Sequence, residues 1–147
     1  MLRYLIQPSF YDLDWMGIVS NISYVRWLED IRSRLLDASP YPMQRLMAEQ
    51  IAPAMLTTHV DYHNAYIGIE GGLIEARVGR GEKMGRSRWQ LVTHFHHADS
   101  DQKLVSATQT GCFVKLPSVR PTRTPTEMSA FFDEHLAPDT DYFVGKL

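Results

Sequence analysis

Cysteine is almost absent from this 147-residue chain, since Cys112 is the single example. One cysteine cannot form a disulfide within the chain, and its isolation favours a reducing compartment. No apolar stretch approaches the roughly 20 residues of a membrane-spanning helix. The apolar run in residues 1–10 is too short for a signal peptide, because Arg3 and Gln7 interrupt it. We therefore expect a cytoplasmic protein that makes no membrane contact.

The chain also lacks an excess of charge of either sign. Its 15 basic and 17 acidic residues give a formal net charge of −2, which argues against a nucleic-acid partner. Repeats, low-complexity segments and linkers are missing as well. Hydrophobic residues make up 44% and charged residues 22%, which is ordinary globular usage. The sequence predicts a single domain over residues 1–147, which is long enough to bury a packed core.

Hydrophobic periodicity predicts one long buried helix and five strands. The helix runs from Ile22 to Leu36, with Ser20 or Asn21 as its N-cap and Pro40 beyond its end. Strands are expected over residues 2–6, 54–62, 74–78 and 88–95, where the two faces alternate residue by residue, and over residues 103–116, which are long enough for a full strand. A weaker helix is expected over residues 43–50, and a closing helix after the capping box 124–127. Short turns favour antiparallel neighbours, so the sequence predicts an α+β domain whose sheet wraps around the helix.

The segment from Tyr11 to Arg32, YDLDWMGIVSNISYVRWLEDIR, places a carboxylate, a glycine turn and a helix start within one loop's length. A helix start offers unpaired N–H groups and partial positive charge, which together suit an oxyanion. Asp14 is positioned to act on a carbonyl held there. A thioester needs little more, because its leaving thiol has a pKa of about 8.5 and requires no strong general acid. Asp14 could equally be a turn former or a helix cap, which is the commoner role of aspartate before a helix.

This segment resembles the hot-dog-fold acyl-CoA thioesterases of the 4-hydroxybenzoyl-CoA thioesterase type. Their signature is an aspartate, a glycine with a hydrophobic pair, a polar N-cap and an aromatic-rich helix. The matching residues here are Asp14, Gly17-Ile18-Val19, Ser20-Asn21, Tyr24, Trp27 and Glu29. The stretches 81–87 and 120–125 are similar to two further segments of the family. The resemblance implies a hot-dog fold, in which an antiparallel five-stranded sheet wraps around a long central helix.

The resemblance also implies a function and a site. It implies hydrolysis of an acyl-CoA or acyl carrier protein thioester, with Asp14 as nucleophile or general base and without a cofactor. The backbone N–H of Asn21 would polarise the thioester carbonyl. It implies a homodimer or homotetramer with active sites at the subunit interface. Lys83, Arg86 and Arg88 would contact the CoA phosphates, although a basic turn can also be a solvated edge that discourages strand aggregation.

Two departures from the family pattern affect the substrate. Ile18 stands where many relatives have histidine, and Trp15 is larger than the residue that commonly follows the aspartate. Together with Gly17, both are expected to line the region of the acyl group, whose identity stays open. Two other functions also stay open: a non-catalytic acyl-thioester-binding protein, and a hydratase or dehydratase of the same fold. The latter usually needs a histidine near the helix, and none precedes His59.

His94 and His96 share one strand face at a spacing that is also found at metal sites. No third ligand is evident nearby in the sequence. We therefore expect a solvent-facing pair without a metal. Cys112 lies within a strand pattern and is expected to fill the core.

Overall fold

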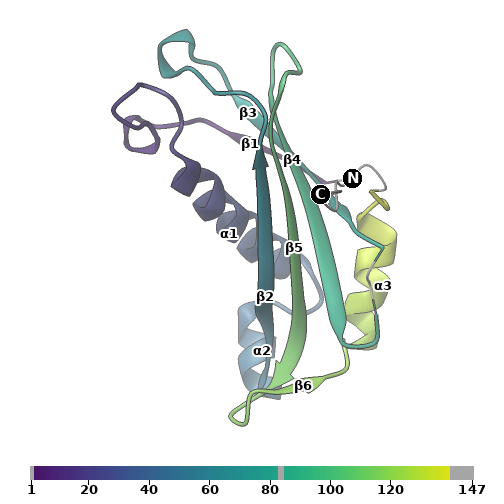
Figure 1. The fold of residues 1–147 in the computed structure, drawn as a ribbon. Helices are drawn as coiled ribbons and strands as arrows, with labels where there is room; N and C mark the ends of the chain where they lie inside the picture. The colour runs from purple at the N-terminus through teal and green to yellow at the C-terminus, as the bar shows by residue number, and fades with distance from the viewer. Residues whose placement is uncertain (1, 83–84, 140–147) are drawn as a thin grey trace.

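The computed structural model describes residues 2–82 and 85–139 of the chain (Figure 1). Its helices are α1 (Asn21–Ala38), α2 (Met43–Glu49) and α3 (Thr126–His135). Its strands are β1 (Leu2–Ile6), β2 (Ile51–Tyr62), β3 (Ile74–Arg80), β4 (Arg88–His97), β5 (Lys103–Lys115) and β6 (Arg120–Thr122). Two 3₁₀ turns cover Phe10–Asp12 and Gly68–Glu70. Within these described residues, no helix has the length and apolarity needed to cross a bilayer.

The strands form one antiparallel sheet in the order β1-β3-β4-β5-β2. All five strands of this path were predicted. The short β6 was not predicted; it pairs with β5 through three residues and makes the sheet six-stranded. β2 lies at one end of the order, so in the described part of the chain its outer edge pairs with no other strand.

The long helix α1 packs against the inner face of the sheet, as the sequence predicted. Ser20 caps it, because its Oγ accepts a hydrogen bond of 3.3 Å from the Ile22 N–H. Its buried residues are Ser23, Tyr24, Trp27, Leu28, Ile31 and Leu35. The Tyr24 ring meets the ring of Phe95 in β4 with 5.3 Å between centroids. Each fully buried side chain such as Leu28 contributes about 1.5–3 kcal/mol. The α+β class is confirmed.

β2 does not alternate strictly, which corrects the sequence prediction. Its register with β5 shifts between Met55 and Thr57, so one extra residue stands in β2. Such a bulge exchanges the faces of the residues on its two sides. Leu56 is consequently exposed, whereas Met55 packs against the core cluster.

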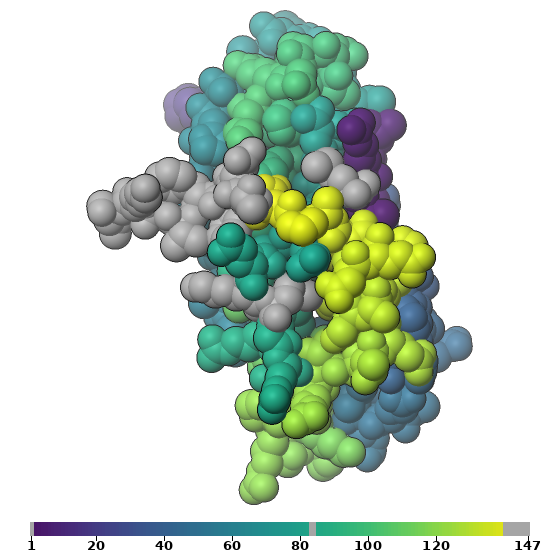
Figure 2. Space-filling view, turned by 90° about the vertical axis from the view of Figure 1, so that its right-hand side faces the viewer, coloured from purple at the N-terminus to yellow at the C-terminus, as the bar shows by residue number. Residues whose placement is uncertain are grey.

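The capping box expected before α3 is not formed. Pro125 is the N-cap residue and makes no side-chain cap, and the buried Thr124 Oγ1 has no hydrogen-bond partner in the described residues. Glu127 turns instead to Arg45 of α2, at 2.8 Å. Figure 2 shows α3, in yellow-green, beside the blue α2 on one face of the molecule. The expected apolar stripe is confirmed, since Met128, Phe132 and Leu136 are buried; Phe131 is only partly buried.

The outer face of the sheet contradicts the expected solvent-facing histidine pair. His94 and His96 are each only 8% exposed. His94 Nδ1 lies 2.9 Å from Ser106 Oγ, and its Nε2 lies 2.9 Å from Asp139 Oδ2. Burial lowers the pKa of His94, although the Asp139 carboxylate acts in the opposite direction. Asp139 follows α3 and reaches back to His94 in β4. The His-x-His spacing alone could not identify this partner. Cys112 is buried, as expected.

Candidate active site

Asp14 begins a tight loop whose shape depends on Gly17. The Asp14 N–H donates to Ile18 O at 2.8 Å, and the Gly17 N–H donates to Asp14 O at 3.0 Å. Gly17 has a φ of +76°, in the left-handed region that other residues rarely adopt. A Cβ on Gly17 would meet nothing within 4 Å. The loop therefore requires glycine for its conformation, and the space beside it is open.

The two carboxylate oxygens of Asp14 have different surroundings. Oδ1 accepts hydrogen bonds from the N–H groups of Met16, at 2.8 Å, and Ile18, at 3.4 Å. Oδ2 has no hydrogen-bond partner in residues 2–82 and 85–139. The side chain is half-buried. One oxygen thus fixes the orientation of the carboxylate, as in a turn former, and the other is available to a ligand.

Asp12 differs from Asp14 because its hydrogen-bonding groups join structural elements. Its Oδ2 accepts from Ser9 N–H at 2.7 Å and from Ser9 Oγ at 3.0 Å. Its backbone oxygen accepts from Ser20 N–H at 2.7 Å and from Ser23 Oγ at 3.2 Å. Asp12 therefore ties the loop to the start of α1.

Residues 66–70 hold the loop from its other side, a contact that the sequence did not reveal. Val19 N–H donates to Tyr66 O at 3.1 Å, and Gly68 N–H donates to Gly17 O at 2.8 Å. The approach is close: a Cβ on Gly68 would lie 2.5 Å from Leu13 Cδ1. These partners are about 50 residues apart, and nothing in either segment signals the pairing.

The start of α1 lies directly after this loop. Asn21 is its first residue and is exposed, and its N–H has no acceptor among the described residues. Helix starts carry such unpaired N–H groups and the positive end of the helix dipole. Tyr62 of β2 fixes the position of this turn, because its hydroxyl donates to Asn21 O at 3.1 Å. Sequence reasoning predicted Asn21 but missed Tyr62.

Several apolar side chains near Asp14 are uncovered. Trp15 is 92% exposed, and Ile18 is half-buried and bridges to Ile67. Other large apolar side chains exposed in these two loops are Phe10, Tyr11, Met16 and Ile69. A cluster of exposed apolar side chains of this kind is typical of an interaction surface. Trp15, Gly17 and Ile18 are not among the residues that line the pocket described below.

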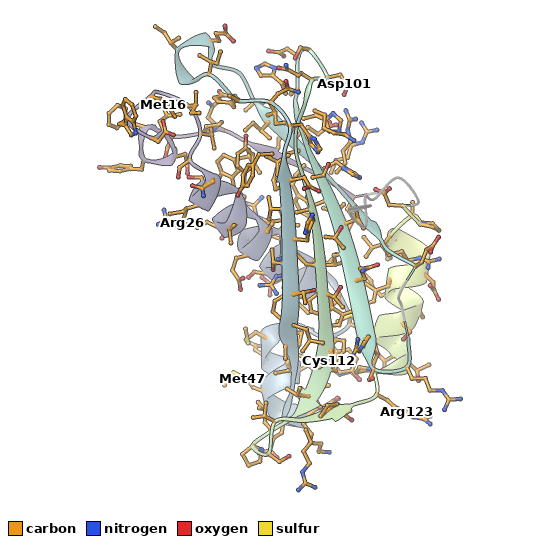
Figure 3. All side chains as sticks on the ribbon, viewed as in Figure 1. Met16, Arg26, Met47, Asp101, Cys112 and Arg123 are labelled. Carbon is orange, nitrogen blue, oxygen red and sulfur yellow. The ribbon has the colours of Figure 1, made fainter. Side chains whose placement is uncertain are left out.

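The predicted phosphate-binding residues lie far from Asp14 in the same chain. Arg86 and Arg88 are exposed at the start of β4, and Lys83 lies outside the described residues. Phe95 of β4 contacts Tyr24 in the first turns of α1. Arg88 lies seven residues earlier in the same strand, which corresponds to roughly 23 Å. Figure 3 places Met16, beside Asp14, at one end of the molecule and Cys112, which pairs with Arg88, toward the other.

A pocket of about 540 Å³ opens toward this second end. It is enclosed by the second half of α1, by α2, by the first residues of β2, and by side chains of β4, β5 and α3. Leu35, Leu46, Ile51 and Phe113 belong to its apolar lining. A volume in this range suits a small-molecule ligand. The sequence predicted none of the pocket residues as site residues: Glu29 was matched only to the helix pattern of the family, and most of the others read as ordinary core.

Comparisons with known proteins agree with these observations. Residues 8–132 match the thioesterase-like superfamily, and the chain belongs to this family. No curated protein matches the chain. Among solved structures, it is similar to the 1,4-dihydroxy-2-naphthoyl-CoA thioesterase of Synechocystis, with 15% identity and a TM-score of 0.80 over 90% of this chain and 96% of that one.

Two further solved structures extend the comparison. A gentisyl-coenzyme A thioesterase is 15% identical, with a TM-score of 0.75 over 89% of this chain and 99% of that one. A hypothetical protein of Staphylococcus aureus, solved in complex with CoA, is 10% identical, with a TM-score of 0.86 over 97% and 89% of the two chains. At these identities the likeness shows the fold, and the predicted hot-dog fold is confirmed.

Proposed function

We propose that this protein hydrolyses an acyl-CoA thioester, or the corresponding acyl carrier protein thioester, in the cytoplasm. Membership of the thioesterase-like superfamily supports the reaction class. The observation that carries the proposal is the Asp14 carboxylate, with Oδ1 fixed by two backbone N–H groups and Oδ2 without a partner among the described residues.

The chemistry needs only the groups at the start of α1. The thioester carbonyl oxygen accepts a hydrogen bond from the Asn21 N–H, where the helix dipole stabilises the negative charge that develops. Asp14 Oδ2 either attacks the carbonyl carbon or takes a proton from an attacking water. The C–S bond then breaks and the thiolate leaves. When water is the attacking group, this step gives the free acid; when Asp14 itself attacks, it leaves an anhydride with Asp14, which a water molecule then hydrolyses to the free acid. Trp15, Gly17 and Ile18 lie beside the reacting group in this arrangement.

We further propose that the active site is shared between two copies of the chain. The twelve-residue β2 has a free outer edge in the described residues, and such edges pair readily. A two-fold axis through β2 would place the Asp14 end of one copy beside the Arg86 and Arg88 end of the other. There, together with Lys83, these cations can bind the CoA phosphates. Two such dimers can associate further into a tetramer.

Thiol release from a panel of acyl-CoAs tests the proposal. Asp14→Asn keeps the oxygen that accepts from Met16 and Ile18 but can neither attack a carbonyl nor take a proton. We expect turnover to fall at least about 100-fold, with little change in melting temperature. Asp12→Asn, in the same loop, is the control and retains most activity.

A near wild-type rate for Asp14→Asn would remove the catalytic role of this residue. If the wild type binds acyl-CoAs but releases thiol from none of them, the protein is a non-catalytic acyl-thioester binder. In that case Asp14 would have a structural role alone, through the two hydrogen bonds that its Oδ1 accepts.

A further inference from the structure

The face of the sheet that is turned away from α1 carries a chain of hydrogen bonds between side chains. Phe95 in β4 and Val105 in β5 belong to the core on the side of α1. Their neighbours in the two strands, His94 and Ser106, therefore point to the opposite face, and they are paired in the register. Asp139, which follows α3, reaches the same place. This cluster thus lies on the other side of the sheet from α1 and the site at its start.

The distances in this cluster are those of a nucleophile, its base and a group that orients the base. Ser106 Oγ lies 2.9 Å from His94 Nδ1, and His94 Nε2 lies 2.9 Å from Asp139 Oδ2. A serine is activated when these three types of group lie within about 2.6–3.2 Å of one another in this order. When His94 Nε2–H donates to Asp139, the Nδ1 atom of the neutral ring carries the lone pair that can take the Ser106 proton.

The cluster is shielded at one end and open at the other. The side chains of His94 and Asp139 are only 10% and 13% exposed. Ser106 is partly buried, and the exposed His63 lies beside it, with its Nε2 atom 3.0 Å from Ser106 Oγ. A small reagent can therefore approach Ser106 from the side of His63, while the base and its orienting carboxylate stay out of bulk water.

The charges around Ser106 suit a reaction that develops negative charge near its Oγ. The ring of His63 can donate from Nε2, and Lys103 of β5 adds a positive charge nearby. Burial lowers the pKa of His94, and the positive charge of Lys103 lowers it further, so the ring is a neutral base at neutral pH. The carboxylate of Asp61, opposite Ser106 in β2, pairs with a histidine of its own strand at 3.0 Å.

We propose that Ser106 is the nucleophile of a second site, which hydrolyses small activated esters independently of Asp14. Ser106 Oγ forms a bond to the ester carbonyl carbon while His94 Nδ1 takes the hydroxyl proton. The C–O bond to the leaving group then breaks, and His94 gives its proton to that group. A water molecule, deprotonated by His94, next hydrolyses the acyl-serine to the free acid and restores the Ser106 hydroxyl. Asp139 is a positioning residue, because it orients the ring through Nε2 and stabilises its protonated form.

A fluorophosphonate probe tests whether Ser106 is activated, because such a reagent labels a serine whose proton a base removes. Serine Oγ bonds to the phosphorus atom and fluoride leaves. We expect peptide mass spectrometry to locate the label at Ser106 in the wild type, and also in Asp14→Asn, where the first site is disabled. Ser106→Ala should lose the label, whereas Thr108→Ala, which removes a hydroxyl from the same face of β5, should keep it. An unlabelled Ser106 in the folded wild-type protein would overturn the proposal.

Hydrolysis of p-nitrophenyl acetate by the Asp14→Asn protein tests the positioning role of Asp139. Adding Asp139→Asn should lower the rate at least about tenfold, because an amide stabilises protonated His94 poorly. The Asp139 carboxylate raises the pKa of His94, and the reaction needs the neutral ring. The rise of the rate with pH should therefore move to lower pH in Asp139→Asn, a shift that a merely structural role would not produce. If Ser106→Ala in the same background hydrolyses the ester at an unchanged rate, the proposal fails.

The outcomes separate this site from the proposed thioesterase function. If Ser106 is labelled but no acyl-CoA releases thiol, the second site stands and the thioesterase function fails. If thiol release depends on Asp14 while the probe leaves Ser106 unmodified, the thioesterase function stands and the second site fails.

Discussion

The two ends of this molecule carry different groups, which the proposed dimer would combine into one site. At one end, the Asp14 loop and the start of α1 provide a carboxylate and an N–H without an acceptor among the described residues, but they do not line the pocket. At the other end, the pocket and two exposed arginines provide space and positive charge. Roughly 23 Å of β4 separates Arg88 from the aromatic contacts of α1 near the first end. In the proposed dimer, each chain would therefore contribute one half to each of two sites.

The two ends are also built differently. Backbone hydrogen bonds hold the Asp14 loop: some join residues within the loop, and others join it to residues 66–70. Their number and direction hold the Asp14 carboxylate in one orientation, which its proposed catalytic role requires. Packing of flexible side chains forms the pocket, which leaves it adaptable. Changes at the first end should therefore affect the rate of chemistry, and changes at the second should affect substrate affinity or stability.

The largest effect after loss of the carboxylate itself is expected at Gly68. In Gly68→Ala the new Cβ would lie 2.5 Å from Leu13 Cδ1 and 2.9 Å from Gly17 O, so the loop must move. Because a displacement of about 1 Å can cost 100-fold in rate, we expect kcat to fall between about 10- and 100-fold. Gly85→Ala, where a Cβ meets nothing within 4 Å, is the control. Steady-state kinetics that show an unchanged kcat in Gly68→Ala would mean that the loop is not positioned by residues 66–70.

A smaller effect, on affinity alone, is expected at the second end. Replacing both Arg86 and Arg88 by alanine should raise KM for acyl-CoA about tenfold with little change in kcat, because charge-assisted contacts to phosphate are lost. Acyl-pantetheine lacks the nucleotide, so its KM should hardly change. If both substrates lose equally, these arginines have a structural role.

The smallest effect on catalysis is expected at Gly111, beneath the pocket. A Cβ there would lie 2.1 Å from Trp89 Cζ2 and 2.4 Å from Ala54 O. Gly111→Ala should therefore destabilise the fold by about 1–3 kcal/mol, as overpacking does, which denaturant unfolding can measure. For an acyl-CoA that the wild type hydrolyses, kcat should stay close to the wild-type value, because Gly111 pairs with Trp89 at the end of the molecule opposite to Asp14. A large loss of kcat on such a substrate would show that the two ends are not independent.

Local sequence patterns predicted most of the fold. The apolar periods of α1 and of the five main strands are strong signals, because each element buries a continuous face. What the patterns missed depends on distant partners. The bulge at Leu56 interrupts an alternation that the sequence continues, and Arg45 attracts Glu127 away from the expected capping box. His94 and His96 are buried by residues that no pattern near them indicates.

The candidate site was predicted in part for the same reason. Asp14, Gly17 and Asn21 lie within eight residues, so the sequence alone suggested them. Tyr62 and residues 66–70 join this loop from a different part of the chain, and no local signal marks them.

Mixed dimers test most directly whether the two ends of two copies form one site. The Asp14→Asn protein and the protein with alanine at positions 86 and 88 are each impaired, at opposite ends of the chain. Random pairing of equal amounts gives about one half mixed dimers, each with one intact site. At low acyl-CoA concentration we therefore expect the mixture to have about a quarter of wild-type activity. This is well above the average of the activities of the two unmixed variant proteins. Activity equal to that average, in dimers shown to be mixed, would contradict a site shared between subunits.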